Sequence, residues 1–420
     1  MTTVLPMRPE PRKDFELSLD EIAREGARRM LVQALGLEVE DYIESHKDEV
    51  DENGRRLVVR NGLSRSRKVT MGSGAVDVSQ PRVDDRRDGE RFLSKVLPPY
   101  LRKSPKIESL LPILYLKGLS TNDFRSSLSG FFGEGTMGLS PSSIVKLKKI
   151  WEDEFDLWSK RAITKRYVYM WVDGVNVQIR LGEDKKVCLL VIIGVTDKGE
   201  KDLLAVHPGY RESEDSWAVV LRSLTSRGLV APKLAIGDGA LGFWAALRTV
   251  GGFEQCEEQR CWVHKIANVL DKLPKRVQPD AKNLLHEMMK APTEADALTV
   301  RKQFEKLFDD KYPKASNCLV KSWPELTTFF RYPAAHWISL RTTNPIESSF
   351  ATVKLRTKVT KGSGNKTAAT TMAFKLLQEC QKKWRKIRGE PVDLENILNG
   401  LEYKDGIVIA RSAHHEAAAS

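Results

Sequence analysis

The sequence predicts an α/β protein built on a mixed sheet, and two observations in its middle third carry that prediction. Apolar residues alternate with a period of two along three successive segments, as in neighbouring antiparallel strands. These segments are 167–181, 187–195 and 202–206. A helical pattern at 213–227, an apolar run ending at Asp238 and a helical pattern at 240–250 then follow. A meander of strands followed by strand–helix alternation indicates a sheet with antiparallel and parallel pairs.

Composition narrows the class of protein and of partner. A chain of 420 residues is too long for one ordinary core, so we expect two or three domains. The net charge of +12 favours a polyanionic partner. Nucleic acid is preferred to a membrane, because no apolar run approaches the length of a bilayer span and no lipidation motif appears. Five cysteines in a large chain suggest reduced thiols, so we expect a cytoplasmic protein.

The first 160 residues are predicted to form a mainly helical DNA-binding region. Helical spacing follows Ser18, which with Glu21 could form a capping box. A basic segment rich in strands and turns comes next, and its density of cations favours phosphate contact over a merely solvated surface. Helices around Gly118 then outline a helix-turn-helix, although any three-helix packing unit shows the same outline. The three segments are 1–53, 54–105 and 106–160.

The rest of the chain divides into four further segments. The sheet region is followed by a polar helical stretch without strand signals, then by basic helices, and finally by a tail that we expect to be loosely packed. The segments are 161–264, 265–335, 336–390 and 391–420.

Two acids stand where buried apolar runs end, each followed by glycine: Asp173 and Asp238. Phosphodiester chemistry commonly uses Mg²⁺ held by convergent carboxylates, which a sheet can bring together. Each acid taken alone also fits a common structural role. Asp173 with Gly174 fits a hairpin turn or a bulge, and Asp238 fits a helix cap. Glu347, three residues after Asn344, fits a capping box.

A series of motifs decides between these interpretations. They are Asp173-Gly174-Val175, Glu212-Ser213 with Trp217, Arg227-Gly228-Leu229, Gly237-Asp238-Gly239, Arg260-Cys261-x-x-His264-Lys265 and Arg341-Thr342-Thr343-Asn344-Pro345-Ile346-Glu347. In this order they resemble the Mutator-type transposases of bacterial insertion sequences (the IS-two-fifty-six family). The resemblance implies a DDE transposase with an RNase H-like core interrupted by an all-helical insertion. It implies that Asp173, Asp238 and Glu347 hold two Mg²⁺ or Mn²⁺ ions, and that the protein acts near the bacterial nucleoid as a homodimer or higher multimer.

Other side chains are predicted to support the active site or to contact DNA. They are Cys261, His264, Arg341, Asn344, Lys354, Arg356, Trp323 and Trp337. Zinc at Cys261 and His264, with Cys256 and His286 as further ligands, matches no common zinc spacing. Either tryptophan could stack on an unpaired base, although core packing is the commoner role.

Two functions from different classes therefore remain. The first is a transposase that binds the terminal inverted repeats of its element, cuts there and joins the ends to target DNA. The second is a transposase-derived DNA-binding regulator that has lost catalysis. The complete set of three acids favours the first. A nonspecific nuclease is disfavoured by the large basic region before the sheet.

Overall fold

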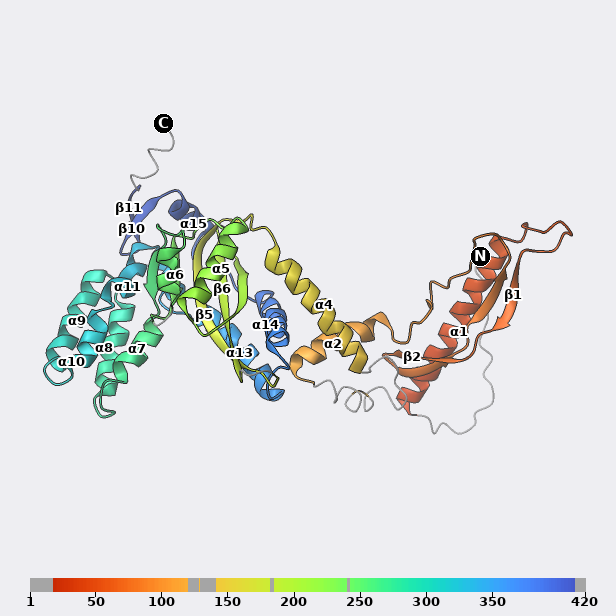
Figure 1. The fold of residues 1–420 in the computed structure, drawn as a ribbon, viewed down its shortest axis with the longest axis horizontal. Helices are drawn as coiled ribbons and strands as arrows, with labels where there is room; N and C mark the ends of the chain where they lie inside the picture. Colours follow the sequence, from red (N-terminus) through yellow and green to blue (C-terminus); the bar gives the residue numbers. More distant parts are fainter. Residues whose placement is uncertain (1–17, 120–127, 129–140, 182–184, 240–241, 412–420) are drawn as a thin grey trace, which may run out of the picture. The chain divides into compact units, whose positions relative to one another are not determined.

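The computed structural model describes residues 18–119, 128, 141–181, 185–239 and 242–411. The chain forms two compact units, Met1–Leu147 and Lys148–Ser420 (Figure 1). The boundary falls inside one helix, α4 (Pro141–Lys160). The seven segments predicted from the sequence are finer than this division, and their boundaries stay predictions.

The first unit packs a helix on short strands. Helix α1 (Leu19–Ser45) begins with the predicted Ser18–Glu21 capping box. Strand β1 (Val58–Leu63) pairs with β4 (Pro81–Asp85), and β2 (Arg67–Met71) pairs with β3 (Gly74–Val78), both antiparallel. Helix and strands share one small apolar core: Leu35, Val69, Val76, Val78 and Leu97. The basic segment is therefore anchored to the helix that precedes it.

The predicted helix-turn-helix is described only in part. Its first helix, α2 (Pro105–Lys117), keeps Pro112 inside and ends at Gly118, whose φ is 118°. Its third helix corresponds to α4. The predicted second helix, near 120–131, lies outside the described residues except at position 128. The motif therefore stays a prediction.

The second unit is built on a five-stranded mixed sheet, as predicted. Strands β5 (Tyr167–Gln178), β6 (Lys186–Thr196) and β7 (Lys201–Gly209) form an antiparallel meander. Strands β8 (Leu234–Gly237) and β9 (Glu257–Arg260) are added parallel to β5. The order across the sheet is β7-β6-β5-β8-β9, so β5 lies in the middle.

Helices cover both faces of this sheet. On one face, α5 (Glu214–Ser226) and α6 (Phe243–Thr249) share a core with alternate residues of β5, among them Met170 and Val172. The intervening residues point to the other face, because side chains alternate along a strand. There the Trp171 indole donates to the Ser339 carbonyl at 3.2 Å. Helices α13 (Asn344–Val359) and α14 (Lys366–Gln381) pack against β5 and β7.

Strand β5 corrects one prediction. Its pairing with β6 runs through Asp173 and Gly174 without a shift, so the Asp-Gly hairpin and the bulge at Gly174 are both wrong. The burial pattern changes there for another reason. Up to Trp171 the strand is paired on both sides, with β6 and β8, whereas beyond it only β6 pairs with it.

Between β9 and α13 every regular element is helical, as predicted. The elements are α7 (Trp262–Leu270), α8 (Gln278–Lys290), α9 (Glu294–Phe308), α10 (Pro313–Val320), α11 (Trp323–Thr327), the 3-10 turns η1 (Thr328–Arg331) and η2 (Ala334–His336), and α12 (Trp337–Leu340). Figure 1 shows them gathered beside the sheet. The Trp262 N–H donates to the Arg341 carbonyl at 2.9 Å, so the segment leaves and rejoins the sheet at one point.

The end of the chain is better packed than predicted. Helix α15 (Pro391–Leu398) is followed by a hairpin of β10 (Leu401–Lys404) and β11 (Ile407–Arg411). Leu394 and Ile397 lie one turn apart on α15 and are both buried. The expectation of a loose tail is therefore wrong up to Arg411, and residues 412–420 lie outside the described part.

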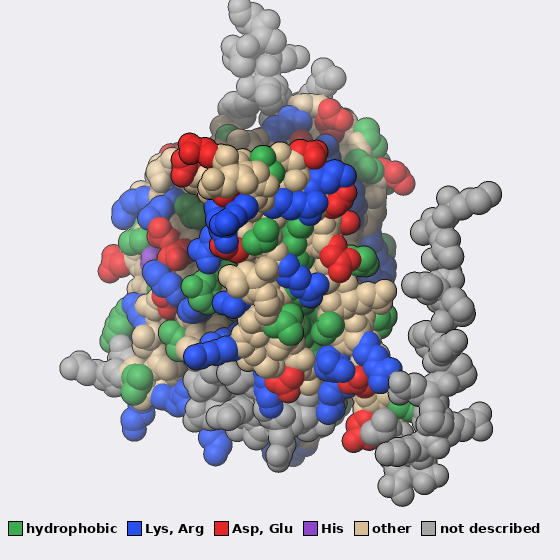
Figure 2. Space-filling view, turned by 90° about the vertical axis from the view of Figure 1, so that its right-hand side faces the viewer, with side chains coloured by type: hydrophobic (Ala, Val, Ile, Leu, Met, Phe, Trp, Pro, Cys, Tyr) green, Lys and Arg blue, Asp and Glu red, His purple; other side chains and the backbone are tan. Residues whose placement is uncertain are grey.

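The basic surface is mixed with acids. On the face drawn in Figure 2, Lys and Arg side chains lie among Asp and Glu side chains. Within 54–105, the Arg87 guanidinium pairs with Asp85 at 2.8 Å, and the Arg67 guanidinium donates to two carbonyls. Part of the predicted DNA-contacting charge therefore stabilises the fold. No helix in the described residues is long and apolar enough to cross a membrane.

Candidate active site

The two aspartates lie at the same end of neighbouring strands. Asp173 is in β5, and Asp238 directly follows β8. The parallel register pairs Trp171 with Ile236, and its continuation brings the two aspartates level. Strands in a sheet are only about 4.8 Å apart, so this register places the two aspartates at the same end of neighbouring strands. Each carboxylate accepts the N–H of the following glycine, at 2.8 Å for Asp173 and 2.5 Å for Asp238.

Glu347 comes from the first turn of α13, which packs against β5. The cap of this helix is Thr343, not Asn344 as the capping-box interpretation required, and no side chain caps it. Asn344 is instead the first helical residue and is exposed. The Thr343 hydroxyl donates to Glu347 Oε1, so the carboxylate is oriented by a neighbouring side chain rather than used to close the helix end.

A fourth carboxylate, Glu212, joins this group. It follows β7 and precedes Ser213, the cap of α5. A Cβ atom at Gly174 would lie 2.1 Å from Glu212 Oε1, so this carboxylate packs against the backbone next to Asp173. The sequence analysis quoted Glu212 within a motif but assigned it no role. The available signal was an acid at a strand-to-helix junction, the position that Asp238 also occupies.

The acids perturb one another. Burial raises the pKa of Asp173 to about 7, and the charges of Glu212 and Glu347 add to the effect. Burial and the charge of Asp238 likewise raise the pKa of Glu212. Among the described residues, no Lys or Arg forms an ion pair with any of the four acids. Negative charges that repel one another without a Lys or Arg partner are typical of a site that takes up a cation.

His264 is the cationic neighbour of these acids. Its Nδ1 lies 3.8 Å from Glu347 Oε1. A hydrogen bond with Cys261 raises the pKa of His264 to about 9 against the opposing effect of burial, and the charges of Asp238 and Glu347 contribute. The imidazole is therefore protonated at neutral pH, and it offsets part of the local negative charge.

Cys261 is fully buried, and its Sγ lies beside hydrogen-bond donors. Its Sγ accepts from the Thr343 N–H at 3.4 Å, and the Thr343 hydroxyl lies at 3.2 Å. Burial alone would raise its pKa, but hydrogen bonds with His264 and Thr343 lower it. These contacts support the expected core role of the thiol.

Two groups of possible metal ligands lie here, and only the first is gathered within a few ångströms. In the described residues, atoms of Cys261, His264 and Glu347 lie within 4.8 Å of one another, and neither Cys256 nor His286 joins them. Thiolate and imidazole suit Zn²⁺, and the proposed pair of additional zinc ligands is absent from this cluster. The hard oxygen donors of the four acids suit Mg²⁺ or Mn²⁺ instead. The oxygens of Asp173, Asp238 and Glu347 are not gathered within the same 4.8 Å.

The other predicted cations lie along the elements that lead to Glu347. The Arg341 guanidinium is stacked 4.7 Å from the Phe329 ring and 5.2 Å from the Trp337 ring, and burial lowers its pKa to about 10. Lys354 is exposed on α13, two turns after Glu347. Arg356 is buried on the same helix.

Both candidate tryptophans pack in the helical core. The Trp323 indole packs edge-on against Trp262, and the Arg301 guanidinium lies 4.8 Å above it. The Trp337 indole donates to the Tyr332 carbonyl at 2.7 Å. Each side chain is at most 8% exposed, which supports the core-packing interpretation.

Comparison with known proteins identifies the family of the chain. The chain is 49% identical over 282 residues to the transposase of insertion sequence element IS6120 from Mycolicibacterium smegmatis, an alignment covering 67% of this chain and 86% of the relative. It is 42% identical over 284 residues to the transposase of element IST2 from Acidithiobacillus ferrooxidans, covering 67% and 95%. It is 25% identical over 374 residues to the transposase of IS256 in transposon Tn4001 from Staphylococcus aureus, covering 87% and 91%. Residues 8–387 match the family described as "Transposase, Mutator family". The chain therefore belongs to the Mutator family of transposases.

Proposed function

We propose that this protein is a DDE transposase that binds the terminal inverted repeats of its insertion sequence and catalyses metal-dependent cleavage and strand transfer of DNA. The strand order β7-β6-β5-β8-β9 supports an RNase H-like core, and the helical segment between Asp238 and Glu347 has the position of the expected insertion. The observation that carries the proposal is the group of four carboxylates at one end of the sheet, none of which pairs with a Lys or Arg among the described residues.

Asp173, Asp238 and Glu347 would hold two Mg²⁺ or Mn²⁺ ions, and Glu212 is close enough to Asp173 to share in that charge. Such ions activate the attacking water or 3′-hydroxyl and stabilise the leaving oxygen. The contribution of the protein is to hold the carboxylates in place. Asp173 is held on the central strand β5 by its pairing with β6, and Thr343 orients the carboxylate of Glu347. A covalent link between protein and DNA is not needed.

His264 has a separate role in this scheme. Protonated at neutral pH and beside Glu347, it can donate a hydrogen bond to a phosphate oxygen that enters the acid group. Its charge also limits the repulsion between the acids before DNA arrives.

The first unit is the proposed reader of the terminal repeats, and the protein would act at the nucleoid in the cytoplasm as a homodimer or higher multimer. The alternative of a regulator without catalysis leaves the group of four acids unexplained. A binding protein has no use for carboxylates whose pKa is raised by burial and by mutual repulsion, because both effects destabilise the fold when the acids are charged.

The test uses labelled DNA from the end of the element with Mg²⁺. We expect Asp173→Asn and Asp238→Asn each to abolish cleavage and joining and to leave DNA binding within about twofold, because the carboxylates contribute to the reaction and not to recognition. Asp215→Asn, which removes an exposed acid from α5, is the matched control and should keep full activity. Cleavage by the Asp173→Asn protein would refute the assignment.

A further inference from the structure

A cavity of about 810 Å³ that is lined by several charged side chains opens beside the acid group and is not used by the proposed mechanism. Its wall includes Gly239, the neighbour of Asp238, and its other walls come from β9, α6, α7 and α10. Six cationic side chains line it: Arg248, Arg260, Lys265, Lys272, Lys314 and Lys321. We call it the Arg260 pocket. One of its two acids, Glu258, is paired with Arg248 at 2.8 Å, which leaves Glu325 as the acid facing the other five cations.

The two innermost cations are unusual. Lys265 is only 2% exposed, and its ammonium group donates to the Cys318 carbonyl at 2.9 Å and to the Ser322 hydroxyl at 2.8 Å. The Arg260 guanidinium donates to the same hydroxyl at 2.5 Å, and its Nε has no partner. Among the described residues, neither cation forms an ion pair with a carboxylate.

A buried ammonium group and a half-buried guanidinium that converge on one neutral oxygen repel each other, and each also loses hydration. An anion between them would offset both costs. A Cβ at Gly239 would lie 1.8 Å from Arg260 Cζ. The guanidinium is therefore packed against the backbone that follows Asp238.

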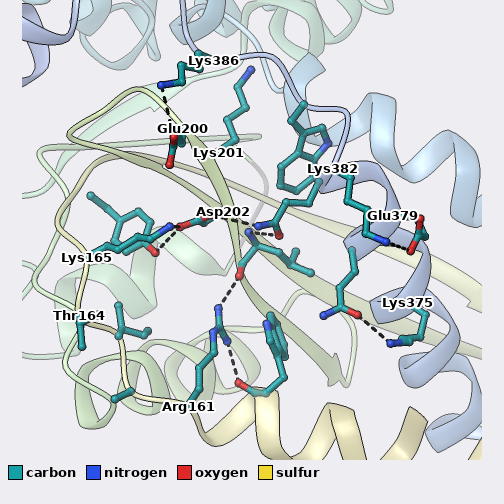
Figure 3. A pocket seen from close by; sticks show the side chains of 18 residues that line it. Arg161, Thr164, Lys165, Glu200, Lys201, Asp202, Lys375, Glu379, Lys382 and Lys386 are labelled. Atoms are coloured by element: carbon teal, nitrogen blue, oxygen red, sulfur yellow. Dashed lines mark hydrogen bonds and ion pairs between the residues drawn. The ribbon is translucent and has the colours of Figure 1, made fainter. Parts of the chain in front are cut away.

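A second basic cavity differs from the Arg260 pocket in how its cationic side chains are paired. That cavity, of about 750 Å³, lies beside the start of β5 and is also rich in lysine (Figure 3). Two of its lysines are paired with acids along dashed lines in Figure 3: Lys165 with Asp202 at 2.8 Å, and Lys386 with Glu200 at 3.5 Å. Most of its lysines are paired within the fold, whereas in the described part of the chain Arg260 and Lys265 are not.

We propose that the Arg260 pocket binds a phosphodiester group of the DNA strand that is cut, next to the phosphate that reacts at Asp238. Arg260 and Lys265 would contact the phosphate oxygens, the arginine as a fork and the lysine as a point charge. Lys314 and Lys321 are exposed at the rim and would meet the adjoining phosphates. The volume lies within the range of about 300–1,000 Å³ that is usual for pockets enclosing a small ligand, so a nucleotide fits. The proposal rests on the proposed function, since it takes DNA as the substrate.

A native cysteine makes the pocket directly testable. Cys318 lines it and is half-buried, whereas Cys380 is equally accessible but lies on α14, away from the pocket. Duplexes of the element end, each with a disulfide-activated tether on one phosphate, are incubated with the full-length protein in Ca²⁺, so that the strand stays intact. We expect a disulfide cross-link at one or two consecutive phosphates beside the cleavage position. The cross-link should be lost with Cys318→Ser and kept with Cys380→Ser.

Removing cations from the rim of the pocket tests whether the rim binds DNA. Lys314→Ala with Lys321→Ala removes two cations from the pocket, and Lys302→Ala with Lys306→Ala removes two exposed cations from α9 in the same helical segment. The first pair should weaken binding of the end duplex about tenfold at physiological salt and reduce the slope of log K against log salt by nearly two. The second pair should change both quantities little. Equal effects of the two pairs would mean that general electrostatic attraction, not a pocket, explains the binding.

Failure of this proposal is distinguishable from failure of the proposed function. If wild-type protein cleaves the end DNA in Mg²⁺ but no phosphate position cross-links to Cys318, the pocket assignment is wrong and the enzyme assignment stands. If the cross-link forms but Mg²⁺ supports no cleavage, the pocket holds DNA and the catalytic assignment fails. A cross-link that appears equally at every phosphate would also overturn the pocket, since it would show unspecific contact.

Discussion

Thr343 connects the residues of the acid site. Its hydroxyl donates to Glu347 Oε1, lies 3.2 Å from Cys261 Sγ and lies 3.5 Å from His264 Nδ1. The residue is fully buried, so its hydroxyl cannot exchange these partners for water. We therefore regard Thr343 as a positioning residue for Glu347.

Replacing this hydroxyl should slow the reaction without affecting DNA binding. Thr343→Val keeps the shape of the side chain but removes the donor, so single-turnover cleavage of bound end DNA should fall at least about tenfold. Thr343→Ser retains the hydroxyl and should stay within about threefold of wild type. If valine and serine act alike, the hydroxyl does not orient Glu347.

The pKa of Asp173 predicts how the metal-free protein responds to pH. The pKa is about 7 in the fold, against an ordinary value of 3.8 for an aspartate. The folded state therefore binds the proton more tightly than the unfolded state does. The contribution of Asp173 to the free energy of unfolding is fully present below about pH 4, and it falls by on the order of 3 kcal/mol as the pH rises to 7. Asp173→Asn should flatten this part of the profile, because asparagine does not titrate.

Urea unfolding between pH 4 and 8, in the presence of a chelator, measures how the free energy of unfolding depends on pH. All nine tryptophans lie between Trp151 and Trp384, so their fluorescence reports on the second unit only. An unfolding free energy that rises from pH 4 to 7 in wild type would contradict the assigned direction of the shift.

The sequence identified individual site residues where their neighbours along the chain were enough to mark them. Asp173 and Asp238 were recognisable because each ends an apolar run before a glycine. Glu212 was missed because its role depends on the end of β7 approaching Gly174, a contact between residues far apart in the sequence. The cap of α13 was misassigned by one residue, since both Thr343 and Asn344 are good capping residues and spacing cannot choose between them.

Among the elements, the start of α6 depends on a close backbone approach. The N–H of Gly242 donates to the Glu212 carbonyl at 2.9 Å, and a Cβ there would lie 2.3 Å from the Glu214 nitrogen. The obstructing atoms are backbone atoms, so they cannot turn aside as a side chain would.

Gly242→Ala should therefore destabilise the second unit by about 2 kcal/mol or more, and it should also displace Glu212. Gly364→Ala is the matched control, because no atom lies within 4 Å of its added Cβ. The midpoint of urea unfolding, followed by tryptophan fluorescence, compares the two. Equal midpoints would show that the loop before α5 moves freely.

Elements were predicted well where one periodicity dominated. The strands of the central sheet and the helices between β9 and α13 follow their apolar patterns. The predicted bulge at Gly174 failed because a change in burial along one strand has two causes, a shifted register or the loss of a neighbouring strand, and the pattern shows only the change. The hairpin of β10 and β11 was not predicted for a different reason, since its strands are short and largely exposed.

For the whole molecule, the two units have separate apolar cores, so the second should fold alone. We expect a fragment of residues 141–420, which keeps all of α4, to unfold in one cooperative thermal transition. It should bind DNA but no longer prefer the terminal repeat to a shuffled sequence, because the proposed reader is absent. Circular dichroism and competition binding test these points. A fragment that retains full preference would assign recognition to the second unit.

The narrow base of the helical segment, where the Trp262 N–H meets the Arg341 carbonyl, has a consequence for finding related enzymes in genomes. Because both ends of the segment meet, its length is decoupled from the geometry of the acids, and the entropy of closing a loop grows only with the logarithm of its length. Whole helices can be gained or lost over evolution without moving Asp238 or Glu347. Searches that require a fixed interval between these acids will therefore miss relatives, whereas searches on the short neighbourhood of each acid will find them.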